Sequence, residues 1–326
     1  MSGDYRMVFR TTGGPEVIER EPITLGQPGA GEARVRNEAV GVNFIDTYQR
    51  SGLYPLSLPS GLGSEGAGIV EAVGQGVTDI APGDRVAYAG GPVGAYASVR
   101  SMPADRLVKL PEGIATDTAA AAMLKGMTVD MLAGECGAVE AGMTVLVHAA
   151  AGGVGSLLVQ WLKAIGATVI AHAGSPEKAA KAKALGADHA LHGGFDTLAS
   201  DVRAITDGRG VDVAFDGVGK ASWAATLASV TRRGLVVSYG NASGAVPPFA
   251  PLELSKAGSL FLTRPTLFDY VETRERLEAS AARLFAMIAS GKVRIEIGRR
   301  FPLADAADAH RALEARATTG STILLP

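Results

Sequence analysis

The chain has 326 residues, with 31 basic and 33 acidic side chains and a net charge of −2. This balance argues against capture of nucleic acid or anionic lipid through a surplus of basic charge. Hydrophobic residues make up 47% and charged residues 20%, as in ordinary globular proteins, which argues against intrinsic disorder. Because single cores stop growing at roughly 250–300 residues, the length predicts two domains.

Cysteine content and apolar runs limit where the chain acts. Cys136 is the single cysteine, so an intramolecular disulfide and a zinc site built on three or four cysteines are both impossible. Residues 1–10 lack the apolar core of a signal peptide, and no apolar run approaches the roughly 20 residues that span a membrane. We therefore expect a cytoplasmic protein without a membrane or nucleic-acid partner.

The first third of the chain is predicted to be rich in β-strands. Residues 32–40 alternate polar and apolar side chains, residues 66–74 form a second strand candidate, and residues 81–87 read as a turn leading into a strand. Short strands between glycines and prolines are typical of a compact, partly open barrel or sandwich.

The pattern changes to alternating strands and helices after a helix predicted at 119–132. The predicted strands are 144–149, 167–173, 211–216 and 234–240, and the predicted helices are 155–165, 176–185 and 222–230. This order indicates an α/β fold with a parallel sheet covered by helices. Two further helices are expected at 270–290 and 303–316, and the run 321–325 is expected to return as a strand to the first domain.

A glycine-rich loop, residues 149–155, follows one predicted strand and opens a helix. Against the pattern G-x-G-x-x-G its three positions are Ala150, Gly152 and Gly155. At the second position a missing side chain lets a pyrophosphate approach the backbone, and at the third it lets the helix pack closely on the strand. With helix N–H groups facing the phosphates, the loop predicts a dinucleotide site.

The end of the next strand indicates which dinucleotide binds. NAD sites place an acidic residue there for the ribose 2′-hydroxyl, but residues 171–178 have none at the strand end. Gly174 and Ser175 instead offer space and a hydroxyl, and Lys178 offers the positive charge that a 2′-phosphate requires. We therefore predict NADPH. The alternative is that the lysines of this helix only form a solvated face.

Several blocks of sequence resemble one known family. They are residues 41–55, 61–74, 149–155, 238–244 and 258–265, and the similarity continues to residues 316–321. On these blocks the chain is similar to the zinc-free quinone oxidoreductases related to zeta-crystallin, in the medium-chain dehydrogenase/reductase superfamily. The resemblance implies a GroES-like β-rich catalytic domain (1–124 and 266–326) and a doubly wound Rossmann domain (125–265), with NADPH and substrate between them.

The resemblance also implies the residues of the site. Asn43 and Tyr48 should face the nicotinamide or the substrate, and Thr128 should lie near the nicotinamide. The remaining cofactor contacts that it implies are Gly152, Gly153 and Val154 at the pyrophosphate, Gly174, Ser175 and Lys178 at the 2′-phosphate, and Tyr239, Asn241, Arg264 and Arg316 along the groove. Bacterial relatives often add a tyrosine after the third strand, but the aligned place here is about Gly193, so the NADPH preference rests mainly on Lys178.

A catalytic zinc ion is not expected. The alcohol-dehydrogenase branch holds zinc with a Gly-His-Glu block, and this chain has Ser64 in place of that histidine. The five histidines form no metal constellation. His189 and His192 are interpreted as surface histidines, the alternative being that they share one face of a helix or loop. Without a Lewis acid to polarise an alcohol oxygen, alcohol oxidation is disfavoured.

Quinone reduction fits the remaining polar groups. A quinone is a strong electrophile, so its reduction needs an oriented dihydronicotinamide and stabilisation of the developing oxyanion. We assign positioning and oxyanion stabilisation to Asn43 and Tyr48, with Arg264 as a further substrate contact and solvent as the candidate proton source. Tyr48 alternatively only stacks on the cofactor, and Tyr54 either borders the substrate or is a loop aromatic.

Three nearby polar residues are interpreted as structural. Glu65 is predicted to serve a buried hydrogen-bond network, Asp46 to cap a short helix before Tyr48, and Cys136 to be structural because no electropositive group surrounds it.

Two alternative functions and a homodimeric assembly are further hypotheses. A reductase of activated C=C bonds, such as enals or enones, is the first alternative, and a cofactor-binding protein with a structural or RNA-binding role is the second, which the lack of basic aromatic patches disfavours. Residues 259–263 are expected at a sheet edge, and the family resemblance implies a homodimer that forms through this region.

Overall fold

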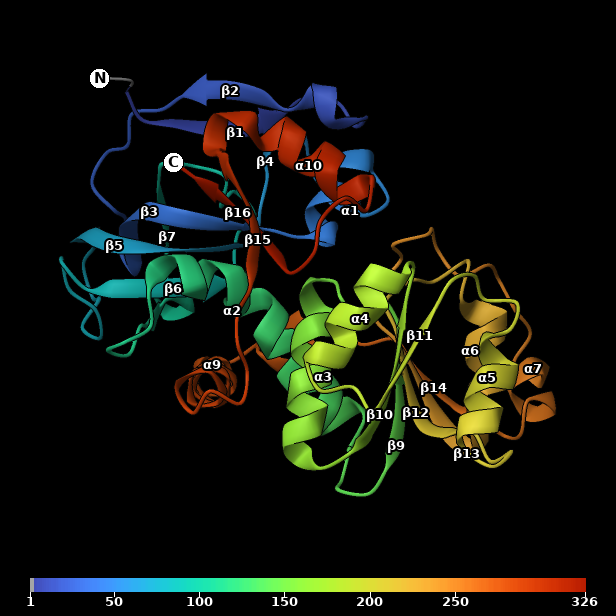
Figure 1. The fold of residues 1–326 in the computed structure, drawn as a ribbon. Helices are drawn as coiled ribbons and strands as arrows, with labels where there is room; N and C mark the ends of the chain where they lie inside the picture. The colour runs from blue at the N-terminus through green and yellow to red at the C-terminus, as the bar shows by residue number, and fades with distance from the viewer. Residues whose placement is uncertain (1–2) are drawn as a thin grey trace. The chain divides into compact units, whose positions relative to one another are not determined.

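The computed structural model describes residues 3–326. Met1 and Ser2, which begin the segment predicted to lack a signal peptide, lie outside the described residues. The chain divides into two compact units (Figure 1): unit 1 comprises the described part of Met1–Met127 with Val271–Ala289 and Ile295–Pro326, and unit 2 comprises Thr128–Tyr270 with Ser290–Arg294. The α/β fold class is confirmed, whereas the domain bounds at residues 124/125 and 265/266 stay a prediction.

Unit 1 is built on a β-sheet, as its alternating sequence predicts. Its strands are β3 (Glu32–Val42), β5 (Glu65–Val73), β6 (Arg85–Ala89), β7 (Val99–Pro103), β8 (Val108–Lys109), β15 (Ile297–Pro302) and β16 (Ser321–Leu325). The order is β15-β16-β3-β5-β6-β8, with β7 also paired to β3. A smaller sheet joins β1 (Tyr5–Phe9), β2 (Glu19–Pro22) and β4 (Ser60–Gly61) in the order β2-β1-β4.

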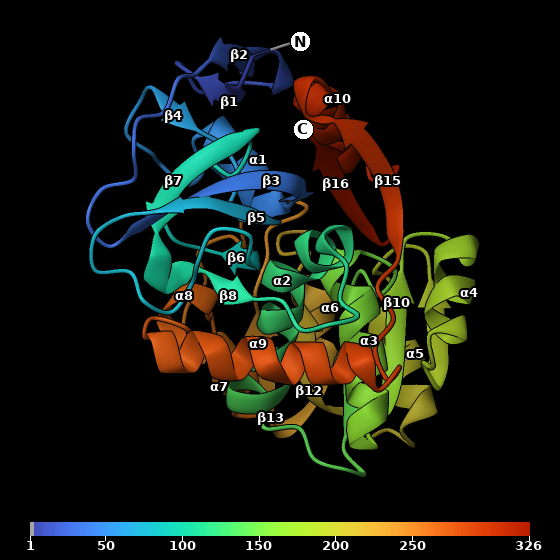
Figure 2. The same cartoon turned by 90° about the vertical axis from the view of Figure 1, so that its left-hand side faces the viewer.

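The last strand returns to the first part of the chain, as predicted. In β16, Thr322 pairs with Val42 and Ile323 pairs with Gly41 of β3. Figure 2 shows β15 beside β16 with α10 (Ala306–Glu314) next to them. The core of unit 1 therefore joins segments that are far apart in sequence, among them Phe9, Tyr96 and Leu303.

The helices of unit 1 differ slightly from the predicted ranges. They are α1 (Phe44–Ser51), α9 (Arg274–Ala289) and α10, with three-residue 3-10 turns η1 (Pro15–Val17), η2 (Ala104–Arg106) and η4 (Leu303–Asp305). Helix α2 (Thr116–Met131) begins in unit 1 and ends in the first residues of unit 2. The range expected as one helix at 270–290 is α9 preceded by the separate short α8 (Leu267–Tyr270).

Unit 2 is a six-stranded parallel sheet with helices on both faces (Figure 1). Its strands are β9 (Thr144–Val147), β10 (Thr168–Ala173), β11 (His189–His192), β12 (Val211–Asp216), β13 (Val230–Ser238) and β14 (Phe261–Thr263), in the order β11-β10-β9-β12-β13-β14. Its other helices are η3 (Leu132–Cys136), α3 (Gly153–Ile165), α4 (Pro176–Ala184), α5 (Leu198–Ile205), α6 (Trp223–Ser229) and α7 (Leu252–Lys256). The strand order reverses between β9 and β12, and such switch points are where doubly wound sheets bind ligands.

Strand β11 and helix α5 are among the elements of unit 2 that were not expected from the sequence. His189 and His192 are exposed, as the interpretation as surface histidines predicts, but they share no helix or loop face: both lie on β11, where His189 pairs with Ile170 and His192 with Ala173. Side chains three residues apart on a strand point to opposite faces. Helix α5 was also missed. Its residues Leu198 and Val202 pack into the core of unit 2.

No helix within residues 3–326 is long and apolar enough to cross a membrane.

Candidate active site

The turn from β9 to α3 has the close packing that the glycine pattern predicts. Ala149 has a positive φ of 49°, and Gly152 is the N-cap of α3. A Cβ at Gly155 would overlap the carbonyl oxygen of Ala149 and lie 2.8 Å from the Cα of Ala150. Only a glycine lets α3 approach the turn this closely. Because the first N–H groups of a helix lack partners within it, those of Gly153 and Val154 are available to an anion at this end.

The end of β10 brings together the three residues predicted to bind a 2′-phosphate. Gly174 is exposed, and a Cβ at this position would meet no other atom within 4 Å. Ser175 is the N-cap of α4, and its Oγ accepts a hydrogen bond of 3.3 Å from the backbone N–H of Lys178. Ser175 also hydrogen-bonds the exposed Glu177, which lowers the pKa of that carboxyl. The lysine side chain therefore starts half-buried beside an open, polar strand end.

A buried carboxylate holds the loops after β12 and β13. Asp216 Oδ1 accepts the N–H groups of Val218 (2.8 Å) and Gly219 (3.1 Å). Ser222 and Thr226 donate their hydroxyls to Asp216 Oδ2 at 2.7 and 2.8 Å. These donors compensate the burial of the charge, and they fix the backbone of residues 217–219. This cluster was not predicted from the sequence, in which an acidic residue at the end of a predicted strand was the available signal.

Three predicted cofactor residues of unit 2 lie around that fixed loop. The backbone N–H of Tyr239 donates to the carbonyl of Asp216 at 2.8 Å, and a Cβ at Gly217 would lie 2.8 Å from the Tyr239 ring. Asn241 lies in the same loop after β13. Arg264, just after β14, donates to the carbonyl of Ser238 at 2.9 Å. Thr128 lies elsewhere in unit 2, within α2, where it is half-buried.

In unit 1, Asn43 is the N-cap of α1. Asp46 accepts the backbone N–H of Asn43 at 2.8 Å, so the predicted capping role is confirmed. The helix does not stop before Tyr48 but contains it. The Tyr48 ring packs edge to face on Tyr54 with centroids 5.3 Å apart, so these half-buried tyrosines support each other. Arg316 lies in unit 1, exposed after α10, with a positive φ of 55°.

Glu65 serves a buried hydrogen-bond network, as predicted. Its Oε2 accepts Asn43 Nδ2 at 2.7 Å and Lys125 Nζ at 3.0 Å, and its Oε1 accepts the N–H of Leu124 at 2.8 Å. Glu65 is fully buried and the Lys125 side chain is 5% exposed. A side chain at Gly41 would overlap the carboxylate. The amide of Asn43 is therefore held in one orientation, and Lys125, which the sequence analysis missed, neutralises the charge.

The histidines and the cysteine have no activated geometry. Within residues 3–326, no group of three or more His, Cys, Asp or Glu side chains is arranged to hold a metal ion. The pKa of His148 is lowered to about 4, mainly by burial. Cys136 Sγ lies 3.3 Å from the Tyr270 hydroxyl, and burial raises the pKa of the thiol. A catalytic thiol needs the opposite shift.

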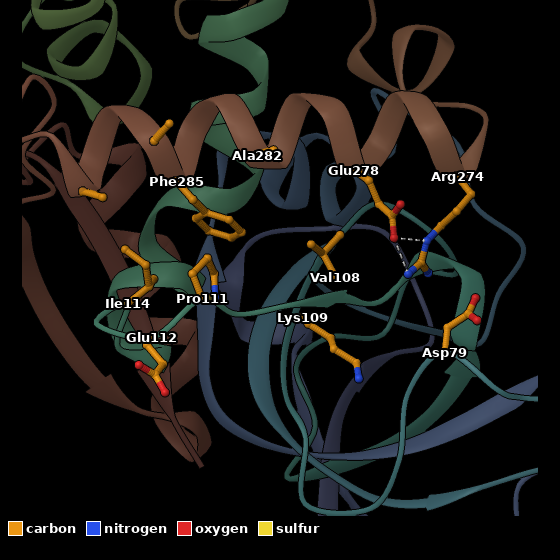
Figure 3. Close-up of a pocket in the computed structure, with 12 residues that line it drawn as sticks. Asp79, Val108, Lys109, Pro111, Glu112, Ile114, Arg274, Glu278, Ala282 and Phe285 are labelled. Atoms are coloured by element: carbon orange, nitrogen blue, oxygen red, sulfur yellow. Dashed lines mark hydrogen bonds and ion pairs between the residues drawn. The ribbon is translucent and has the colours of Figure 1, made fainter.

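A cavity of about 550 Å³ in unit 1 contains none of the predicted site residues. It lies between β8 and α9, and Figure 3 shows Val108, Ile114 and Phe285 around its apolar floor. On its rim, Arg274 and Glu278 form an ion pair of 2.6 Å. The cavity is therefore separate from the residues discussed above.

Comparison with known proteins identifies the family. Residues 29–112 match the alcohol dehydrogenase GroES-like domain, and residues 153–286 match a family described as zinc-binding dehydrogenase. The chain is 52% identical over 322 residues to the quinone oxidoreductase of Pseudomonas aeruginosa, covering 98% of this chain and 99% of the relative. The chain belongs to the quinone oxidoreductase family of the medium-chain dehydrogenase/reductase superfamily.

Solved structures agree with this assignment. A quinone oxidoreductase from Pseudomonas syringae has a TM-score of 0.97 at 50% identity, and that of Escherichia coli, solved with NADPH, has 0.96 at 45% identity; each alignment covers 99% of this chain and 100% of the other. The 2-haloacrylate reductase of a Burkholderia species is 41% identical, covering 98% of both chains. The predicted resemblance to the quinone oxidoreductases of this superfamily is confirmed, and the chain is an oxidoreductase enzyme.

The ion pair of Glu65 and Lys125 gives a stability prediction. Lys125→Met should lower the free energy of unfolding by about 3–5 kcal/mol, because it leaves a buried carboxylate without its countercharge. The double variant Glu65→Gln with Lys125→Met should recover part of the loss, because no charge remains. Urea unfolding measures both. A Lys125→Met variant as stable as the wild type would contradict the buried ion pair.

Proposed function

We propose that this enzyme is an NADPH-dependent quinone oxidoreductase that works without zinc. The observation that carries the proposal is the glycine-lined turn from β9 to α3, with an open, polar strand end beside it, in a chain 45–52% identical to enzymes named quinone oxidoreductases. The structure of the Escherichia coli relative, which is solved with NADPH, supports the choice of coenzyme.

The residues proposed to hold the coenzyme are assigned one by one. Gly152, Gly153 and Val154 bind the pyrophosphate through backbone N–H groups. Gly174, Ser175 and Lys178 receive the 2′-phosphate, for which a hydroxyl and a cation are suitable partners. The other proposed contacts are Thr128, Tyr239, Asn241, Arg264 and Arg316.

Bound NADPH supplies the hydride, and the protein supplies orientation. Asn43 is suited to this role because Glu65 fixes its amide through a buried hydrogen bond of 2.7 Å. A group locked before the reaction stabilises developing charge without reorganising. We assign Asn43 and Tyr48 to positioning and to the oxyanion of the reduced acceptor, with Tyr54 and Arg264 as further substrate contacts and solvent as the proton source.

The donor set of the site supports zinc-free chemistry. Ser64 stands where the alcohol-dehydrogenase branch has a zinc-binding histidine. Both oxygens of the neighbouring Glu65 are engaged by Asn43, Lys125 and the backbone of Leu124. To bind a metal ion, Glu65 would have to give up these hydrogen bonds, and the positive charge of Lys125 would repel the ion.

A second candidate activity is the reduction of an activated C=C bond. It is supported by the 41% identity to a 2-haloacrylate reductase over nearly the whole chain. Hydride delivery is the same for both activities, and the acceptor pocket decides which occurs.

An acceptor panel separates these activities. We expect the purified enzyme to oxidise NADPH fastest with benzoquinone-type acceptors, more slowly with an enal or 2-haloacrylate, and negligibly without acceptor. Absorbance at 340 nm follows the reaction. A preference for the C=C acceptors would support the second candidate. Tight NADPH binding with no turnover would instead indicate a cofactor-binding protein.

Coenzyme choice is predicted to depend on Lys178. Lys178→Ala should raise KM for NADPH by about tenfold or more and leave KM for NADH nearly unchanged, because only the 2′-phosphate loses a charge-assisted contact. Lys183→Ala is the matched control on the same helix, since Lys183 Nζ bonds the carbonyl of Asp188 at 2.6 Å. Equal effects of Lys178→Ala on both coenzymes would contradict the 2′-phosphate assignment.

We also propose that the enzyme is a cytoplasmic homodimer that pairs through β14. This strand is one of the two edge strands of the unit 2 sheet, and Phe261 on it is 60% exposed. Unpaired edges with apolar side chains readily bind a second copy. Light scattering should therefore give about twice the monomer mass of 33.3 kDa, and Phe261→Lys should halve it. A wild-type monomer at working concentration would contradict this proposal.

A further inference from the structure

A network of buried polar groups in unit 1 ends at the start of helix α1. Asp46, Tyr96 and His310 are fully buried, and Arg50 is 2% exposed. They come from α1, from the loop before β7 and from α10, so tertiary packing alone brings them together. Burial of four such groups is costly unless each has a partner.

The hydrogen bonds between these buried groups run in one direction, from Arg50 to Asp46. Arg50 Nη1 lies 3.0 Å from His310 Nδ1, and because a guanidinium has no acceptor, this nitrogen carries the lone pair. The neutral ring then has its proton on Nε2 and donates it to the Tyr96 hydroxyl at 3.0 Å. Tyr96 has one hydrogen, which it donates to Asp46 Oδ2 at 3.0 Å. Burial and Arg50 lower the pKa of His310 to about 3, in agreement with a neutral ring.

Both ends of this hydrogen-bonded network are fixed. At one end, Arg50 Nη2 forms an ion pair of 2.5 Å with Glu314 Oε1, and its Nε donates to the carbonyl of Gly13 at 3.1 Å. At the other end, Asp46 Oδ2 accepts the backbone N–H of Asn43 at 2.8 Å. The network therefore links α10 to the first turn of α1.

We propose that Asp46 is a positioning residue for the reduction: its carboxylate, held through Tyr96 and His310, fixes the start of α1 that carries Asn43 and Tyr48. This role rests on the proposed function, in which those two residues orient the acceptor. Asp46 acts through Asn43, whose backbone it binds directly. When the carboxylate is ionised, both hydrogen bonds at Oδ2 are charge-assisted and roughly twice as strong as neutral ones.

The surroundings of Asp46 make its charge depend on pH near neutrality. Burial raises the pKa of Asp46 to about 7, although the hydrogen bonds from Asn43 and Tyr96 oppose the shift. Glu65 on β5 raises the pKa further and Lys125 on α2 lowers it. Its Oδ1 has no hydrogen-bond partner. The positioning carboxylate is therefore present above pH 7 and is lost by protonation below it.

Stability and activity should respond to this group in opposite directions. The folded-state pKa lies above the unfolded value of about 3.9, so the stability that the protonated group contributes is lost as pH rises through 7. Activity should rise over the same interval. The loss of stability follows from the raised pKa alone, so the rise in activity is what distinguishes a positioning role from a merely structural one.

The experiment compares wild type, Asp46→Asn and Tyr96→Phe across pH 5–9. We expect kcat/KM of the wild type for a benzoquinone acceptor to rise with an apparent pKa near 7. Asp46→Asn should lose this limb, fall about tenfold at pH 8 and unfold no more easily than the wild type there. Tyr96→Phe should move the limb to higher pH, because a donor to the charged form is removed. Asp308→Asn, an exposed carboxyl on α10, is the control and should match the wild type.

A second measurement does not depend on turnover. In protein labelled with ¹³C at aspartate carboxyls, one resonance should titrate near pH 7 and be absent from Asp46→Asn. A carboxyl that titrates near pH 4, or an Asp46→Asn variant that keeps both the acidic limb and the rate, would overturn the role of Asp46. Failure of the wild type to reduce any quinone, with the resonance as expected, would instead identify the proposed function as wrong.

Discussion

The close approach of α3 to the turn after β9 is the constraint on which coenzyme binding depends. No side chain fits between Gly155 and the backbone of Ala149 and Ala150. Because the helix lies this close, its N-terminus is fixed at the carboxyl edge of β9, next to the point where the strand order reverses. The partial positive charge of a helix N-terminus at this place favours a phosphate. The open end of β10 then lies where the ribose that carries the 2′-phosphate is expected.

Buried charges provide the second constraint. Glu65, Asp46 and Asp216 are fully buried, and each accepts hydrogen bonds from residues of other elements or loops. A carboxylate without water needs such donors, so each one fixes the backbone around it. Glu65 and Asp46 fix the start of α1, and Asp216 fixes the loop after β12. Backbone positions that loops alone would leave variable are thereby held for binding and reaction.

Local patterns were sufficient to predict much of this structure. The alternation in residues 32–40 and the strand–glycine–helix succession at 144–165 correspond to β3 and to the β9–α3 turn. The position of Asp46 before Tyr48 predicted a helix cap, and the glycine-rich block around Glu65 predicted a buried acid. The family resemblance supplied the remaining residues of the proposed site, and these stay predictions.

Contacts between distant residues could not be predicted in this way. Arg50 and His310 are 260 positions apart, and Glu65 and Lys125 are 60 apart. Neither pair leaves a periodic signal. Strand β11 was missed because its four residues begin and end with histidine and none is fully buried, so propensity gives little indication there, whereas pairing with β10 stabilises it.

Calorimetric titration of the purified enzyme with NADPH and with NADH is the decisive measurement, because it requires only that the turn after β9 and the end of β10 form a coenzyme site. We predict saturable binding of one NADPH per chain, with a weaker interaction for NADH. A folded protein that gives no heat of binding with either coenzyme, or that binds NADH more tightly, would contradict this coenzyme site.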